Sequence, residues 1–343
     1  MAEQKDLVKV EISHKTVIFT VAFLISLWFL VQIKEIIILV FLSIILLAAL
    51  LKPVEWLTAK KIPRIISVLI VYLIVIGFIS ASIGIIVPPL INQTSAFTSR
   101  LPETISQIND FFIFNKIPVE NLSIVIGRQV QQFTGDIIRV TTTIFSSIFL
   151  MLTIFVMTFY LLLDWKKFVL LIASPFSGKQ EKKVINLIAN VENGLGKWVR
   201  GQLSLSIIVG VLVFLGLTIL GIPYALPLAL IAGFLEIIPV IGPIVSSIPA
   251  ILVALTISPL IALATGALFI IVQQLENNLI VPIIMSKVVG LQPPILMVAL
   301  LIGAKIAGLG GAFLAVPFLI VAKIIIKELI TEDQKIDEDL SEA

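Results

Sequence analysis

Long apolar stretches alternate with short polar segments along most of the chain. A transmembrane helix needs about 20 mainly apolar residues. Several stretches meet this measure, and six are interpreted as helices that cross the bilayer fully: about 16–33, 36–51, 65–89, 142–163, 203–220 and 260–281. The pattern predicts an all-α polytopic membrane protein.

The second half of the chain also contains shorter apolar pieces, arranged twice in the same order. Each time, a full span is followed by two pieces too short to cross the bilayer comfortably. The pieces cover about 224–238 and 244–257 in the first copy, and 295–304 and 312–326 in the second. We interpret each pair as a helical hairpin, which gives about six full transmembrane helices plus two hairpins, or eight to ten apolar segments.

Helix-breaking residues separate the two pieces of each hairpin, at 237–243 and at 303–311. Near both breaks a glycine is followed by a proline with six residues between them: Gly242 and Pro249, then Gly310 and Pro317. Irregular backbone at membrane depth is tolerated only where protein or a water-filled cavity satisfies its polar groups. Inverted repeats with broken helices place the substrate near the midplane of many transporters. The sequence therefore predicts a pocket between the two breaks.

Polar segments divide the chain further. The predicted organisation is N-terminal membrane helices at 1–91, an extramembrane helical segment at 92–140, the fourth transmembrane helix at 141–163, a cytoplasmic basic amphipathic helix at 164–200, a transport core with inverted hairpin repeats at 201–330 and an acidic disordered tail at 331–343.

Basic residues predict the orientation. Lys and Arg number three in residues 1–15, four in 52–64 and seven in 164–200, but only four in the 49 residues of 92–140. Because cytoplasmic loops carry the excess of Lys and Arg, both termini are expected to be cytoplasmic.

Composition excludes several classes of protein. Hydrophobic residues make up 59% of the 343 residues and charged residues 13%, with a mean hydropathy of +1.16, whereas a soluble domain carries about 25% charge. There is no cysteine and a single histidine, His14, so disulfides and zinc sites are not expected. We found no basic block suited to nucleic acid and no enzyme signature. The expectation is a non-enzyme without a cofactor, with coupling to H⁺ or Na⁺ as an option.

Charged side chains within apolar segments are costly and therefore mark candidate functional sites. Glu236 precedes the first break and Lys305 lies within the second. They could form an ion pair, or one could titrate during proton coupling. The alternative is that each reaches an interface and is simply solvated.

Further candidates follow from the same reasoning. Glu276 and Asn277 belong to a polar cluster at the end of a span, which could equally be an exposed helix end. Unpaired backbone groups at the breaks could hold polar ligand atoms or a cation; the residues concerned are Pro239, Gly242, Pro243 and Gly310. The prolines also have a purely structural use, stopping helices. Gln202 is a weaker candidate.

The break residues carry a resemblance to a known family. Glu236-x-x-Pro239-x-x-Gly242-Pro243, with Gly290-Leu291-x-Pro293 and Gly310-Gly311 further on, is similar to motifs of the autoinducer-2 exporter family of permeases. One departure is Gln292, where the resemblance leads us to expect histidine. The resemblance implies an inner-membrane transporter, and relatives are described as exporters of autoinducer-2 or as sodium (lithium)/proton antiporters.

The predicted function is secondary transport of a small polar solute or signal molecule, such as autoinducer-2, across the cytoplasmic membrane of a prokaryote. The expected partners are the lipid bilayer, a small polar solute or cation, and further copies of the chain in a homo-oligomer, but not nucleic acid. One alternative is a sodium (lithium)/proton antiporter. Others are a passive channel and a membrane scaffold with 92–140 or 164–200 as its docking surface.

Overall fold

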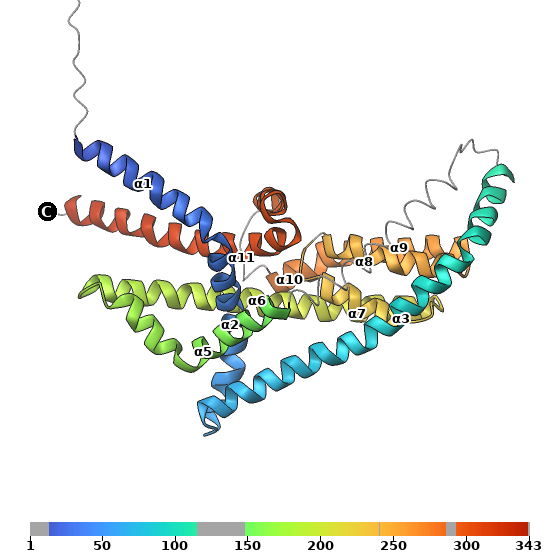
Figure 1. The fold of residues 1–343 in the computed structure, drawn as a ribbon, viewed down its shortest axis with the longest axis horizontal. Coiled ribbons are helices and arrows are strands. Elements are labelled where there is room, and N and C mark those ends of the chain that lie inside the picture. The colour runs from blue at the N-terminus through green and yellow to red at the C-terminus, as the bar shows by residue number, and fades with distance from the viewer. Residues whose placement is uncertain (1–13, 115–147, 240, 286–292, 342–343) are drawn as a thin grey trace, which may run out of the picture.

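The computed structural model describes residues 14–114, 148–239, 241–285 and 293–341. Within these ranges all regular structure is helical (Figure 1). The elements are α1 (His14–Gln32), α2 (Lys34–Ala59), α3 (Arg64–Phe114), α5 (Ile148–Ala173), α6 (Lys179–Ile219), α7 (Ala225–Leu235), α8 (Ile241–Leu255), α9 (Pro259–Leu275), the π-helical turn η1 (Glu276–Ile280), α10 (Val281–Met285) and α11 (Pro293–Ser341).

The described helices confirm an all-α polytopic membrane protein. Seven helical stretches are long and apolar enough to cross a membrane, and two shorter apolar helices, α7 and α8, correspond to the first predicted hairpin. The six predicted full spans fall on α1, α2, α3, α5, the second half of α6, and α9 with the residues that follow it, except that residues 142–147 of the fourth span lie outside the described residues. The seventh long stretch is α11, which contains the second predicted hairpin.

Large apolar side chains cover the outside of the protein. Leu73 and Leu260 are each 76% exposed and Ile219 is 84% exposed. In water such a surface would be unstable, but lipid tails solvate it without penalty, and helices satisfy their own backbone groups there. The surface is therefore that of a membrane protein.

Helices α2, α3 and α5 form one bundle. Its core contains Leu47 and Val68, both fully buried. The Tyr72 hydroxyl of α3 donates to the carbonyl oxygen of Phe155 in α5 at 2.8 Å. Because the hydrophobic effect does not drive helices together in lipid, interhelical hydrogen bonds such as this one and van der Waals packing hold the bundle together.

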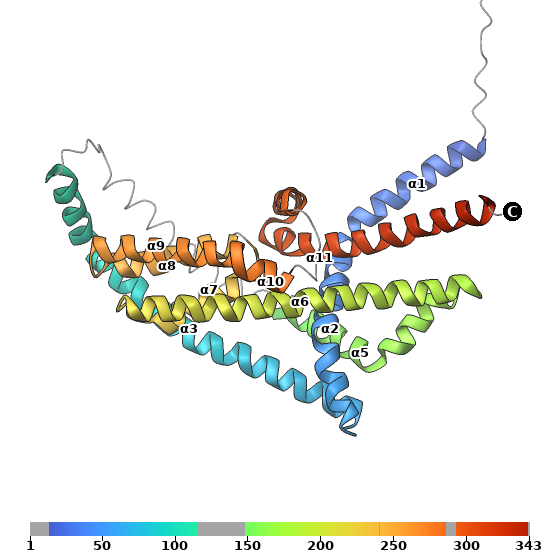
Figure 2. The same cartoon turned by 180° about the vertical axis from the view of Figure 1, so that it is seen from behind.

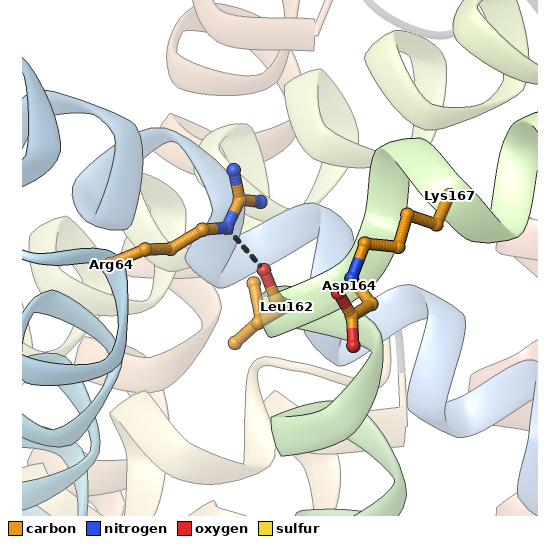
Figure 3. Close-up of polar contacts among 4 residues, drawn as sticks. All are labelled: Arg64, Leu162, Asp164 and Lys167. Atoms are coloured by element: carbon orange, nitrogen blue, oxygen red, sulfur yellow. Dashed lines mark hydrogen bonds and ion pairs between the residues drawn. The ribbon is translucent and has the colours of Figure 1, made fainter.

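Helix α5 bends at Asp164, whose φ of −116° and ψ of 22° are not helical. In the turn before the bend, the Arg64 Nε atom donates to the carbonyl oxygen of Leu162 at 2.7 Å (Figure 3). Lys167 forms an ion pair with Asp164 at 2.7 Å. Arg64 thus fastens the start of α3 to the bend in α5.

Replacing Arg64 by leucine is expected to loosen this attachment. A hydrogen bond from a charged donor contributes about 1.5–3 kcal/mol, so the apparent melting temperature of the purified protein should fall by several degrees. The matched control is Lys166→Leu, which removes an exposed basic side chain at the same bend. Equal melting temperatures for the two variants would contradict the role of Arg64.

Helix α6 connects the two halves of the protein (Figure 2). It contacts α2 and α5, which precede it in the sequence, and α7, α9, α10 and α11, which follow it. The Trp165 Nε1 atom of α5 donates to Glu192 of α6 at 2.5 Å. Helix α6 runs without interruption from the basic amphipathic stretch into the following span, so the predicted boundary at residue 200 is not a helix end.

Two other segments that were predicted to be separate are, in their described parts, continuations of the preceding helices. Helix α3 extends beyond the predicted third span to Phe114, so residues 92–114 continue the same helix, while 115–140 lie outside the described residues. Helix α11 continues to Ser341 through most of the segment that the sequence predicts to be an acidic disordered tail. Gly290, Leu291 and Gln292 also fall outside the described residues.

Candidate functional site

The first break lies between α7 and α8. Its turn begins at Glu236, one residue earlier than predicted, and α8 is already helical at Ile241. The backbone N–H of Ile238 donates to the carbonyl oxygen of Leu235 at 3.0 Å, which tightens the last turn of α7. A Cβ atom on Gly242 would collide with the Leu235 carbonyl group. Glycine therefore allows α8 to cross the end of α7 in backbone contact.

The second break lies within α11. Ala307 (φ −139°, ψ 27°) and Gly308 (φ 59°, ψ −141°) leave the helical conformation, and α11 changes direction (Figure 1). The break is narrower than the predicted 303–311, because only these two residues are non-helical. The two arms of α11 touch where Gly303 meets Gly311, since a Cβ atom on either would collide with the other's carbonyl oxygen. Both breaks are thus sites of backbone contact between helices.

Two carboxyl groups meet at the first break. Glu236 is fully buried and Glu276 is 3% exposed. Their side chains interact directly, although they lie 40 positions apart in the chain. Glu276 accepts a hydrogen bond from the Gln273 Nε2 atom at 3.3 Å. No N–H or hydroxyl group of the described residues donates to either carboxyl oxygen of Glu236.

A π-helical turn contributes Glu276. The N–H of Val281 donates to the carbonyl oxygen of Glu276, five residues earlier. Pro282 follows, and it lacks an N–H for the carbonyl group of Asn278, so a regular α-helix could not close here. Single π-helical turns are frequent at functional sites. This one ends α9 with a buried carboxyl group.

Gln202 of α6 holds the first break. Its side chain is 3% exposed, and its Nε2 atom donates to the main-chain carbonyl oxygen of Glu236 at 2.5 Å. The last carbonyl groups of a helix have no partner within the helix, and Gln202 supplies one here. From the sequence Gln202 was only a weak candidate. The signal that favours it is an uncharged polar side chain inside an apolar helix.

The other predicted site residues divide into two groups. Gly242 and Pro243 are buried at the first break and Pro239 is half-buried beside them. Asn277, Lys305 and Gly310 are exposed.

The ion pair considered between Glu236 and Lys305 does not form in the structure. Lys305 lies two residues before the bend at Ala307, and its side chain is exposed. The ionisable neighbour of Glu236 is Glu276.

A cavity of about 250 Å³ adjoins the first break. Ile237 of the break and Phe313, which follows the second break, both line it. Trp198 and Gln202, one turn apart on α6, form part of its wall. Ile237 of the first break and Phe313, five positions after Gly308, therefore border one cavity.

Comparison with known proteins places the chain in a family. The model for AI-2E family transporters matches residues 17–331. The chain belongs to this family. Like its relatives in the AI-2E family, it is a multi-pass membrane protein with a role in transport.

Relatives of this AI-2E family protein occur in several bacteria. YueF of Bacillus subtilis is 30% identical over 273 residues, which cover 74% of this chain and 73% of YueF. YrrI of the same organism is 31% identical over 293 residues, with 81% and 82% covered. YhhT of Escherichia coli K12 is 24% identical over 262 residues, 74% of each chain. All three bear the name "putative transport protein".

Proposed function

We propose that this AI-2E family protein is a proton-coupled secondary transporter of a small polar solute in the cytoplasmic membrane, with Glu236 and Glu276 as its proton site. One observation carries the proposal. Two carboxyl groups are buried against each other, and neither oxygen of Glu236 has a donor among the described residues.

The proton follows from electrostatics. Isolated charges are too costly to bury, and two adjacent buried carboxylates cannot both ionise. A single shared proton removes the repulsion and leaves one negative charge, held by the hydrogen bond between the two carboxyl groups, as in carboxyl dyads of enzymes. Glu276 already accepts a hydrogen bond from Gln273 and can better bear the negative charge. Glu236 then holds the proton and donates its O–H to Glu276.

Coupling follows from where the two carboxyl groups sit. Glu236 ends α7 at the first break and Glu276 starts the π-helical turn, so each lies where a helix is already interrupted. Loss of the shared proton leaves two like charges that repel. Repulsion separates the break from the π-helical turn, and solute exposure changes with it.

The identity of the solute can be tested directly in liposomes. The family resemblance supports autoinducer-2 as a first candidate, and sodium or lithium ions as the alternative. Purified protein is placed in liposomes that contain a pH-sensitive dye. The internal pH should change when the solute is supplied, because proton movement is coupled to solute movement. A pH change driven by sodium or lithium alone would identify the antiporter instead.

The Glu276→Gln variant tests the proposed proton site. An amide keeps the shape but cannot exchange a proton, so the solute-dependent pH change should slow at least tenfold. The matched control is Glu35→Gln, an exposed carboxylate at the start of α2, which should transport normally. Coupling that survives in Glu276→Gln, or solute flux without proton movement in the wild type, would overturn the proposal.

A further inference from the structure

The cavity beside the first break has a defined position between the two halves of the protein. Its wall comes from α2, α5 and α6, from the first break and from α11. The residues that matter for its chemistry are Leu46, Ala49, Trp198, Gln202, Ile237 and Phe313. With about 250 Å³ it is smaller than the pockets of about 300–1,000 Å³ that hold drug-sized ligands.

The lining determines which ligand could bind. The rings of Trp198 and Phe313 lie 6.0 Å apart between centroids and present flat apolar surface. Gln202 adds an amide, and none of the residues that line the cavity carries a charge. A bare cation would lose its hydration shell there and find no charged group to replace it. A small organic molecule with an apolar body and a hydrogen-bonding group suits the cavity.

The cavity is connected to the proton site through the backbone. Ile237 follows Glu236 directly, and Gln202 bonds the Glu236 carbonyl oxygen. On the other side, Phe313 lies two residues after Gly311, where the arms of α11 touch. A molecule in the cavity would therefore contact the first break and the helix that leaves the second.

We propose that this cavity binds the transported solute, and that the solute is a small, uncharged, amphiphilic organic molecule whose apolar part packs on Trp198 and Phe313 while its polar group bonds Gln202. The proposal rests on the proposed function and adds the solute class and the residues that recognise it.

Binding can be measured without knowing the natural solute. The chain has no cysteine, so Ile237→Cys places a single thiol in the cavity wall. N-ethylmaleimide should label this thiol, and the cavity-filling change Ala49→Phe should slow labelling at least tenfold. The control thiol, Leu263→Cys on the exposed side of α9, should react equally with and without Ala49→Phe.

Two probes of equal size test the role of Gln202. Phenol should protect Ile237→Cys from labelling in a saturable way, and toluene should protect at least threefold less well. Gln202→Met keeps the length of the side chain but removes the amide, and should make the probes equal. Equal protection by both probes in the presence of Gln202, or no labelling of Ile237→Cys, would overturn the proposal and leave a void filled by lipid tails only.

Transport separates this proposal from the proposed function. Ala49→Phe should reduce solute-dependent flux at least tenfold in liposomes, with the carboxyl pair unchanged. Normal flux in Ala49→Phe together with lost coupling in Glu276→Gln would refute the cavity and retain the proton site. Normal coupling in Glu276→Gln with phenol protection intact would refute the proton site and retain the binding cavity.

Discussion

Replacing Glu236 by leucine is expected to make the protein more stable and to abolish proton-coupled transport. The wild-type side chain is fully buried, and no donor among the described residues reaches its oxygens. Burying polar oxygens that accept no hydrogen bond costs about 1–3 kcal/mol, and an apolar side chain of similar volume avoids this cost. The hydrogen bond from Gln202 goes to the main chain of Glu236 and would persist. An apolar side chain, however, carries no proton.

The measurement combines thermal unfolding in detergent with the liposome pH assay. The apparent melting temperature of Glu236→Leu should rise by several degrees, while the solute-dependent pH change falls to the level of empty liposomes. Glu35→Leu is the control, because it removes an exposed carboxylate and should alter neither quantity strongly. A melting temperature well below that of the wild type would show that the carboxyl group stabilises the fold, against the role assigned to it.

Substitution of Gly311 by alanine should damage the fold of α11. A Cβ atom there would collide with the carbonyl oxygen of Gly303, which is backbone and cannot rotate away. The arms would have to separate, and Phe313 would move out of the cavity wall. We expect a loss of at least about 2 kcal/mol, comparable to overpacking of a core, together with lost transport. Yield of monodisperse protein and its melting temperature report the first effect.

The neighbouring glycine is the control. A Cβ atom on Gly310 meets no atom within 4 Å, so Gly310→Ala should fold with wild-type yield and stability. Gly303→Ala should resemble Gly311→Ala, because the same contact is lost from the other side. If Gly311→Ala and Gly310→Ala behaved alike, the arms of α11 would not be in backbone contact in the folded protein.

The apolar pattern was sufficient to predict the membrane class and most of the helices. Lipid requires long uninterrupted apolar runs whose backbone groups bond within the helix. Each run can be recognised from its own local sequence, without knowledge of the rest of the fold. The observed helix breaks at Glu236–Pro239 and Ala307–Gly308 overlap the predicted 237–243 and 303–311, since proline and glycine act locally. The second break was predicted too wide, because glycine permits a bend without requiring one.

Side-chain partners were decided by tertiary structure. Glu236 and Glu276 were each candidates by sequence, but their contact depends on how α7 and α9 pack and on the π-helical turn that ends α9. Lys305 was proposed as a partner of Glu236 and is exposed instead. The role of Gln202 depends on the packing of α6 against the first break, which brings its amide to the main chain of Glu236. Sequence fixes which residues break a helix or avoid lipid, because those effects act within a few residues; which buried groups face each other depends on helix rotation and packing across the whole protein.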